Sequence, residues 1–168
     1  MPNVAQIISR HNNKTLNNNK QQQQQPMCNC RGSKVCPLDG NCLATGVVYQ
    51  ATVTRSDNNT SETYVGLCED KFKFRYNNHT ASFRHESKSS STTLSQYVWK
   101  LKNNNINYNI KWRILTRSKS FSPTNKICRL CISEKYFIIF RPNLSTLNNR
   151  NELTSTCRHK RKLLLANT

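Results

Sequence analysis

The chain has 168 residues, enough for one domain of ordinary size, and its 26 lysines and arginines against 8 aspartates and glutamates give a formal net charge of +18. Such a surface attracts polyanions, so nucleic acid is the leading partner and membrane binding is the weaker electrostatic alternative. No apolar run approaches the roughly 20 residues of a membrane-spanning helix, and the first residues lack the apolar core of a signal peptide. We therefore expect an intracellular, nuclear protein whose eight cysteines are metal ligands or buried thiols.

Composition divides the chain into four parts. Residues 1–27 are polar and rich in asparagine and glutamine, which is typical of a disordered or linker segment. Residues 28–45 form a cysteine-rich knuckle with glycine and proline as turn formers. Residues 46–160 carry the strongest patterns and are expected to form the main domain, followed by a tail over 161–168.

Periodicity predicts three strands and three helices in the order β-β-α-α-β-α. This order lacks a βαβ repeat and favours an α+β fold, in which a small antiparallel three-stranded sheet is flanked by helices. Thr93 is the expected cap of the second helix, and the run from Tyr136 to Phe140 is expected in the core. The predicted strands cover 47–54, 62–67 and 108–116, and the predicted helices cover 70–84, 94–102 and 127–140.

Glu134 is the most informative acidic residue, because acids are scarce in this chain. On a helix it shares an apolar stripe with Ile127, Leu130, Cys131 and Ile138. A carboxylate on such a stripe is costly unless it is paired or binds a cation. Two interpretations stay open, a structural ion pair and a ligand for Mg²⁺ or Mn²⁺, which commonly binds one or two carboxylates and keeps its waters.

Four further polar residues could belong to the same site. Arg75 and His79 lie one helical turn apart, and an arginine fork suits phosphate. A plain basic helix face and a histidine at the edge of the core are the alternatives. Tyr49 and Tyr64 lie on two strands that should pair, where tyrosines are usually packing residues.

The cysteines fall into two groups whose thiolates suit tetrahedral Zn²⁺. Unligated thiols are the alternative for both groups, and Cys68 is left over as a small buried residue. The first group is Cys28, Cys30, Cys36 and Cys42, and the second is Cys128, Cys131, Cys157 and His159.

The order of these residues resembles the GIY-YIG nuclease family. Its two short hairpin motifs fall on Tyr49 and on Tyr64-Val65-Gly66, although Val47 and Val48 replace the glycine and isoleucine of the first motif. The family's later arginine, glutamate and asparagine fall on Arg75, Glu134 and Asn148, and His79 stands where the family often has histidine or tyrosine. The resemblance covers roughly residues 46–150 and implies a DNA endonuclease that hydrolyses a phosphodiester bond.

A closer resemblance is to the endonuclease domain of Penelope-like retroelements, which joins cysteine motifs to such a nuclease core. It implies that Glu134 holds Mg²⁺ or Mn²⁺ at the scissile phosphate, that Arg75 stabilises developing charge, and that Tyr49 with His79 positions or deprotonates the attacking water. Tyr64 and Asn148 would orient the site. The expected product is a nick with a free 3′-hydroxyl, and the implied partners are DNA and the reverse transcriptase domain of a full-length element. The segments that carry this resemblance are 36–42, 97–102, 128–131 and 157–159.

Two other functions remain open. One is a zinc-stabilised nucleic-acid-binding module without catalysis, and the other is a fragment of a decayed mobile element. If the chain is a nuclease, we expect Tyr49, Tyr64, Arg75, His79 and Glu134 to converge on one face of the sheet, because in-line chemistry needs Arg75 and Glu134 near one phosphate.

Overall fold

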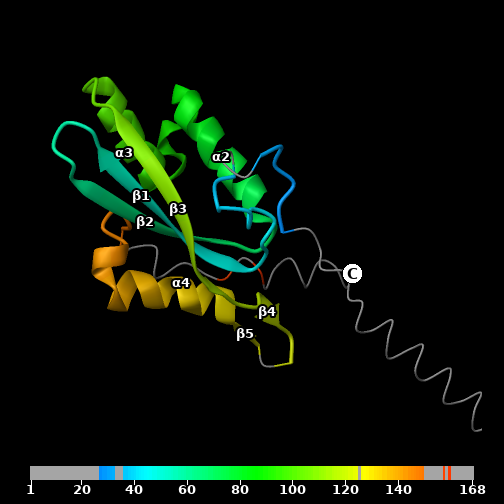
Figure 1. The fold of residues 1–168 in the computed structure, drawn as a ribbon. Coiled ribbons are helices and arrows are strands. Elements are labelled where there is room, and N and C mark those ends of the chain that lie inside the picture. The colour runs from blue at the N-terminus through cyan, green and yellow to red at the C-terminus, as the bar shows by residue number, and fades with distance from the viewer. Residues whose placement is uncertain (1–26, 33–35, 125, 150–156, 158, 160–168) are drawn as a thin grey trace, which may run out of the picture.

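The computed structural model describes residues 27–32, 36–124, 126–149, 157 and 159, so the predicted segment 1–27 (except Met27) and the tail 161–168 lie outside the described residues. Figure 1 shows the main sheet with helices on both of its faces. The elements are β1 (Val47–Arg55), β2 (Ser61–Cys68), α2 (Phe72–Arg84), the 3₁₀ helix η2 (Glu86–Ser91), α3 (Thr93–Asn103), β3 (Tyr108–Arg117), β4 (Phe121–Ser122), β5 (Ile127–Cys128), α4 (Arg129–Phe140) and η3 (Pro142–Leu144).

The main sheet is antiparallel and three-stranded, with the order β2-β1-β3, which confirms the predicted α+β class. Alternation divides the side chains of β1 between two faces. Val47, Tyr49, Ala51 and Val53 pack with α2 and α3. Val48 packs instead with Leu130 and Ile138 of α4. The two helical layers therefore lie on opposite faces of the sheet (Figure 1).

Several predicted boundaries were wrong by one or two residues. The second helix is capped by Thr92, whose side chain accepts a hydrogen bond from Ser95 N, while the Thr93 hydroxyl is buried without a hydrogen-bond partner among the described residues. The serine-rich segment after α2 forms a 3₁₀ helix. The last helix begins at Arg129 because Ile127 and Cys128 pair with β4, which leaves Ile127 45% exposed and off the predicted stripe.

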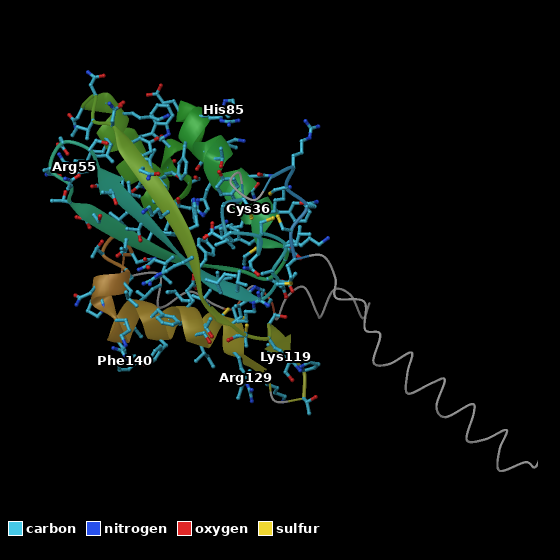
Figure 2. All side chains as sticks on the ribbon, in the orientation of Figure 1. Cys36, Arg55, His85, Lys119, Arg129 and Phe140 are labelled. Carbon is cyan, nitrogen blue, oxygen red and sulfur yellow. The ribbon has the colours of Figure 1, made fainter. Side chains whose placement is uncertain are left out.

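Helix α4 exposes most of the run that was predicted as core. Ile138 is buried and Phe137 is half-buried, but Tyr136, Ile139 and Phe140 are exposed, as is Ile132 one turn earlier. A helix packed on one face of a sheet buries a single stripe, so the remaining apolar residues of a mostly apolar helix face solvent. In Figure 2, Phe140 points away from the sheet. Among the described residues, no helix is both long and apolar enough to cross a bilayer.

Asn148 joins the segment after α4 to the outer edge of β2. Its Oδ1 accepts a hydrogen bond from Val65 N and its Nδ2 donates to Val65 O, both at 2.8 Å. Leu147 N donates to Thr63 O. These bonds satisfy edge groups that would otherwise be open, and they fix the backbone between Tyr64 and Gly66.

Candidate functional site

Tyr49, Arg75 and His79 form a hydrogen-bonded cluster between β1 and α2. The Tyr49 hydroxyl lies 2.8 Å from His79 Nε2 and accepts a hydrogen bond from Arg75 Nε at 3.0 Å. Arg75 and His79 can both reach one phenol because their i, i+4 spacing places them on the same side of α2. Tyr49 is fully buried, His79 is 2% exposed and Arg75 is half-buried, so the arginine connects the cluster to solvent.

The surroundings keep His79 neutral and Tyr49 protonated. Burial and the neighbouring Arg75 charge lower the pKa of His79 to about 3. Burial also raises the pKa of Tyr49, because a phenolate is costly away from water. Because Arg75 already donates to the phenol oxygen, the coherent arrangement has the Tyr49 hydroxyl donating to a neutral His79 Nε2. The cluster thus holds a neutral imidazole and a fixed cation in hydrogen-bond contact with one protonated phenol.

Gly66 on β2 provides the space that Tyr49 occupies. The two residues are cross-strand partners, and a Cβ at Gly66 would lie 2.5 Å from the Tyr49 hydroxyl oxygen and 3.0 Å from Tyr64 Cε1. The phenol crosses this glycine to reach Arg75 and His79. The glycine of the second sequence motif is therefore required by close packing against the tyrosine of the first.

We expect Gly66→Ala to destabilise the fold by about 1–3 kcal/mol, because the added methyl overpacks a buried site and displaces the phenol from both hydrogen bonds. Urea unfolding measures this change. Gly32→Ala is the matched control, since nothing lies within 4 Å of its Cβ position. Equal stability of the two variants would contradict the close approach of Tyr49.

The other predicted residues surround this cluster unevenly. Tyr64 is 5% exposed, and its ring centroid lies 6.0 Å from that of His79 on the same face. Asn148 contacts the backbone of β2 rather than the cluster. Glu134 is half-buried on α4, the helix on the opposite face of the sheet. The prediction that all five residues converge on one face is therefore wrong for Glu134, because α4 lies on the opposite face of the sheet.

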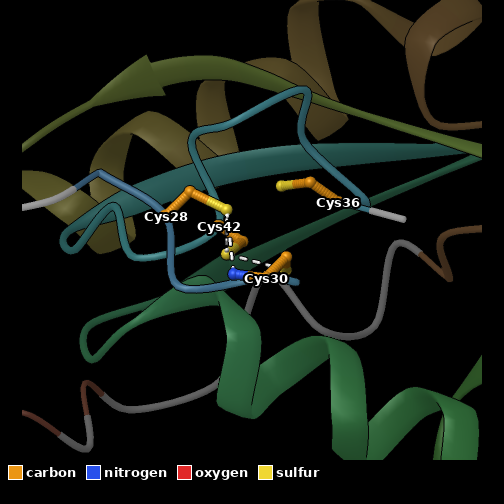
Figure 3. A group of neighbouring side chains, drawn as sticks. All are labelled: Cys28, Cys30, Cys36 and Cys42. Atoms are coloured by element: carbon orange, nitrogen blue, oxygen red, sulfur yellow. Dashed lines mark hydrogen bonds between the residues drawn. The ribbon is translucent and has the colours of Figure 1, made fainter. Parts of the chain in front are cut away.

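The first cysteine group comes together as predicted. The Sγ atoms of Cys28, Cys30, Cys36 and Cys42 all lie within 4.8 Å of one another, with Cys42 at 3.5 Å from Cys28 and 3.7 Å from Cys30 (Figure 3). A Zn–S bond of about 2.3 Å gives a tetrahedron with edges of about 3.8 Å, so the thiols fit a zinc ion. Burial opposes ionisation of Cys36, but hydrogen bonds from the backbone of Leu38 and Gly40 lower its pKa to about 6.

This knuckle also supports the start of α2. Helix α2 has no side-chain cap, and its first N–H groups need acceptors. Phe72 N donates to Ala44 O and Lys73 N donates to Cys42 O at 2.7 Å. The Lys73 ammonium contacts Asn29 Oδ1. A metal held by the knuckle would thus fix the first turn of the helix that carries Arg75 and His79.

The second group joins the start of α4 to residues 157 and 159. His159 Nδ1 lies 3.3 Å from the sulfurs of both Cys128 and Cys131, and Cys131 lies 3.6 Å from Cys157. These four ligand atoms also lie within 4.8 Å of one another. With sulfurs and a ring nitrogen at these separations, the group could hold a metal such as zinc.

Glu69 supports the second group and was missed by sequence reasoning. Its Oε2 lies 3.7 Å from His159 Nε2, on the side of the ring away from the thiols. Histidine ligands commonly direct their free nitrogen at a carboxylate, which fixes the ring orientation and raises its basicity. No sequence pattern links residues 90 positions apart, so only the fold could show this pair.

We expect Glu69→Gln to weaken zinc binding at the second group about 10–100-fold, because the carboxylate beside His159 is lost. Competition with a chromophoric chelator measures this affinity. Glu62→Gln is the matched control, because Glu62 lies near the start of β2, whereas Glu69 directly follows the end of that strand. Equal zinc affinity in the two variants would exclude a supporting role for Glu69.

The chain matches no known family model, and no curated protein or solved structure is similar to it.

Proposed function

We propose that this protein is a metal-dependent DNA endonuclease of the GIY-YIG type, derived from a Penelope-like retroelement. The observation that carries the proposal is the Tyr49–Arg75–His79 cluster. Three residues that the family pattern selects in the sequence meet at a single phenol oxygen, and Gly66 of the second motif makes room for that phenol. The net charge of +18 supports DNA as the partner.

In the proposed reaction, water attacks the phosphorus and the bond to the 3′-oxygen breaks, so that the nick keeps a 3′-hydroxyl. Tyr49, held by Arg75 and His79, would position the attacking water, which loses a proton to solvent, while the leaving oxygen takes a proton from solvent. Arg75 stabilises the negative charge that develops on the phosphate.

Glu134 would supply a ligand for Mg²⁺ or Mn²⁺, which contributes Lewis-acid stabilisation of the leaving oxygen. Among the described residues, the two clusters of potential metal ligands contain cysteine and histidine only. Glu134 would therefore act as a single carboxylate, which fits an ion that keeps most of its waters.

The second candidate is a zinc-stabilised nucleic-acid-binding module without catalysis. The observation that favours it is the complete burial of Tyr49, since an attacking water must reach the phenol. In this case the cluster would be a polar part of the core, and the two cysteine groups would hold structural zinc.

Nicking of supercoiled plasmid by the full chain, with and without Mg²⁺ or Mn²⁺, decides between the two candidates. The endonuclease proposal expects nicked circles that form only with the added metal and that DNA polymerase can extend from a 3′-hydroxyl. Salt-sensitive DNA binding without nicking would establish the binding module instead.

A further inference from the structure

An open cleft of about 670 Å³ lies where β1 begins and β3 ends. Its lining includes Gly46, Glu69, Arg117, Ser118 and Lys119. Its other residues are a threonine, two serines and Phe121. Pockets for small molecules are lined mostly by apolar and aromatic side chains, whereas this one combines hydroxyl groups with two exposed cations. We propose that this cleft binds the phosphodiester backbone of DNA through Arg117 and Lys119.

A bulge in the β1–β3 pairing places Arg117 on the same face of the sheet as Tyr49. Val48 pairs with Thr116 and Tyr49 pairs with Ile114, so Leu115 has no partner. The extra residue reverses the alternation of β3, as bulges do. Arg117 consequently pairs with Val47 and lies on the same face as Tyr49, whereas Arg113 pairs with Gln50 on the other face.

The distance along β1 between the position of Arg117 and the proposed catalytic cluster matches the rise of B-DNA over two nucleotide steps. Its partner Val47 is two residues before Tyr49 on β1, a distance of about 7 Å along the strand. Two nucleotide steps of B-DNA cover a similar distance of about 7 Å along the helix axis. A DNA strand held at Arg117 would therefore place a neighbouring phosphate near the level of Tyr49 and Arg75.

Two features of the cleft favour a phosphate backbone. Gly46 allows the close approach of β1 to the end of β3, and the pairing of Glu69 with His159 leaves the cleft positively charged. Gly46 has φ +59°, and a Cβ there would lie 2.6 Å from Ser118 O, so only glycine allows this close approach of β1 to the end of β3. Glu69 is the one carboxylate in the lining, and it is directed at His159. Figure 2 shows Lys119 beside Arg129, exposed at this end of the molecule.

The proposal rests on DNA being the partner, and the experiment distinguishes failure of the cleft as a DNA site from failure of DNA as the partner. Fluorescence anisotropy with a labelled 20-bp duplex, without added Mg²⁺ or Mn²⁺, measures binding by the full chain and by Arg117→Gln/Lys119→Gln. Lys100→Gln/Lys111→Gln is the matched control, because it removes the same charge from exposed sites outside the cleft. We expect the cleft variant to bind at least tenfold more weakly, and its plot of log K against log salt to lose about two units of slope. The control should lose less than threefold in affinity.

Equal weakening of both double variants would overturn the cleft as a DNA site while leaving DNA as the partner. Binding that depends on the cleft but is not followed by nicking would uphold the cleft and overturn the endonuclease. No binding by the unsubstituted chain would overturn both. Bound zinc should be unchanged in either variant, because neither substitution touches a cysteine or histidine of the two groups.

Discussion

Arg75→Ala and Glu134→Ala are each expected to slow plasmid nicking by about 100-fold or more, the size of effect seen when a group that stabilises transition-state charge is removed. For Arg75 the physical reason is specific. The substitution removes both the cation beside the proposed phosphate site and the hydrogen bond to the Tyr49 hydroxyl. Duplex binding should change little, because one of 26 basic residues is lost.

Arg84→Ala provides the matched control for Arg75. It lies in the last turn of the same helix, is exposed, and carries the same charge. Nicking by this variant should remain within a few-fold of the unsubstituted chain. If Arg75→Ala nicks DNA as fast as Arg84→Ala does, the cluster at Tyr49 is a structural feature and the binding module becomes the better explanation.

Local sequence patterns were sufficient to predict the sheet and the cluster on α2. Ile110, Trp112 and Ile114 alternate, and the structure packs all three against one side of the core. The i, i+4 spacing of Arg75 and His79 correctly placed both on one side of a helix, because a helix brings residues four apart onto the same face. Both cysteine groups also assembled as their compact spacing predicted.

Features that depend on tertiary packing were not predictable. Whether a mostly apolar helix buries Phe140 or Ile138 is decided by which stripe meets the sheet, and the composition of α4 does not reveal that stripe. The bulge at Leu115 leaves no signal in an alternating strand, yet it decides the direction of Arg117. Likewise the contact between Glu69 and His159 joins residues 90 positions apart, which only the folded chain brings together.

Loss of the second metal group is the other change with a large expected effect. Cys131→Ser should lower bound zinc from two ions to one per chain, because a hydroxyl replaces one of three thiolates around His159. Zinc bound only by the folded state contributes its binding free energy to folding. The variant should therefore unfold at a lower urea concentration and should lose the connection between α4 and residues 157 and 159.

Cys68→Ala separates this effect from the loss of any buried thiol. Cys68 is buried and belongs to neither metal group, and its sulfur donates to Asp70 O. Atomic absorption should find unchanged zinc in this variant, with a smaller loss of stability that reflects only the missing sulfur. Unchanged zinc content in both Cys131→Ser and Cys68→Ala would show that the second group holds no zinc. If both contain one ion fewer, the loss follows from general destabilisation. Only a loss of zinc confined to Cys131→Ser would show that the second group holds a metal at α4. Because α4 also carries Glu134, that metal would then support the proposed chemistry.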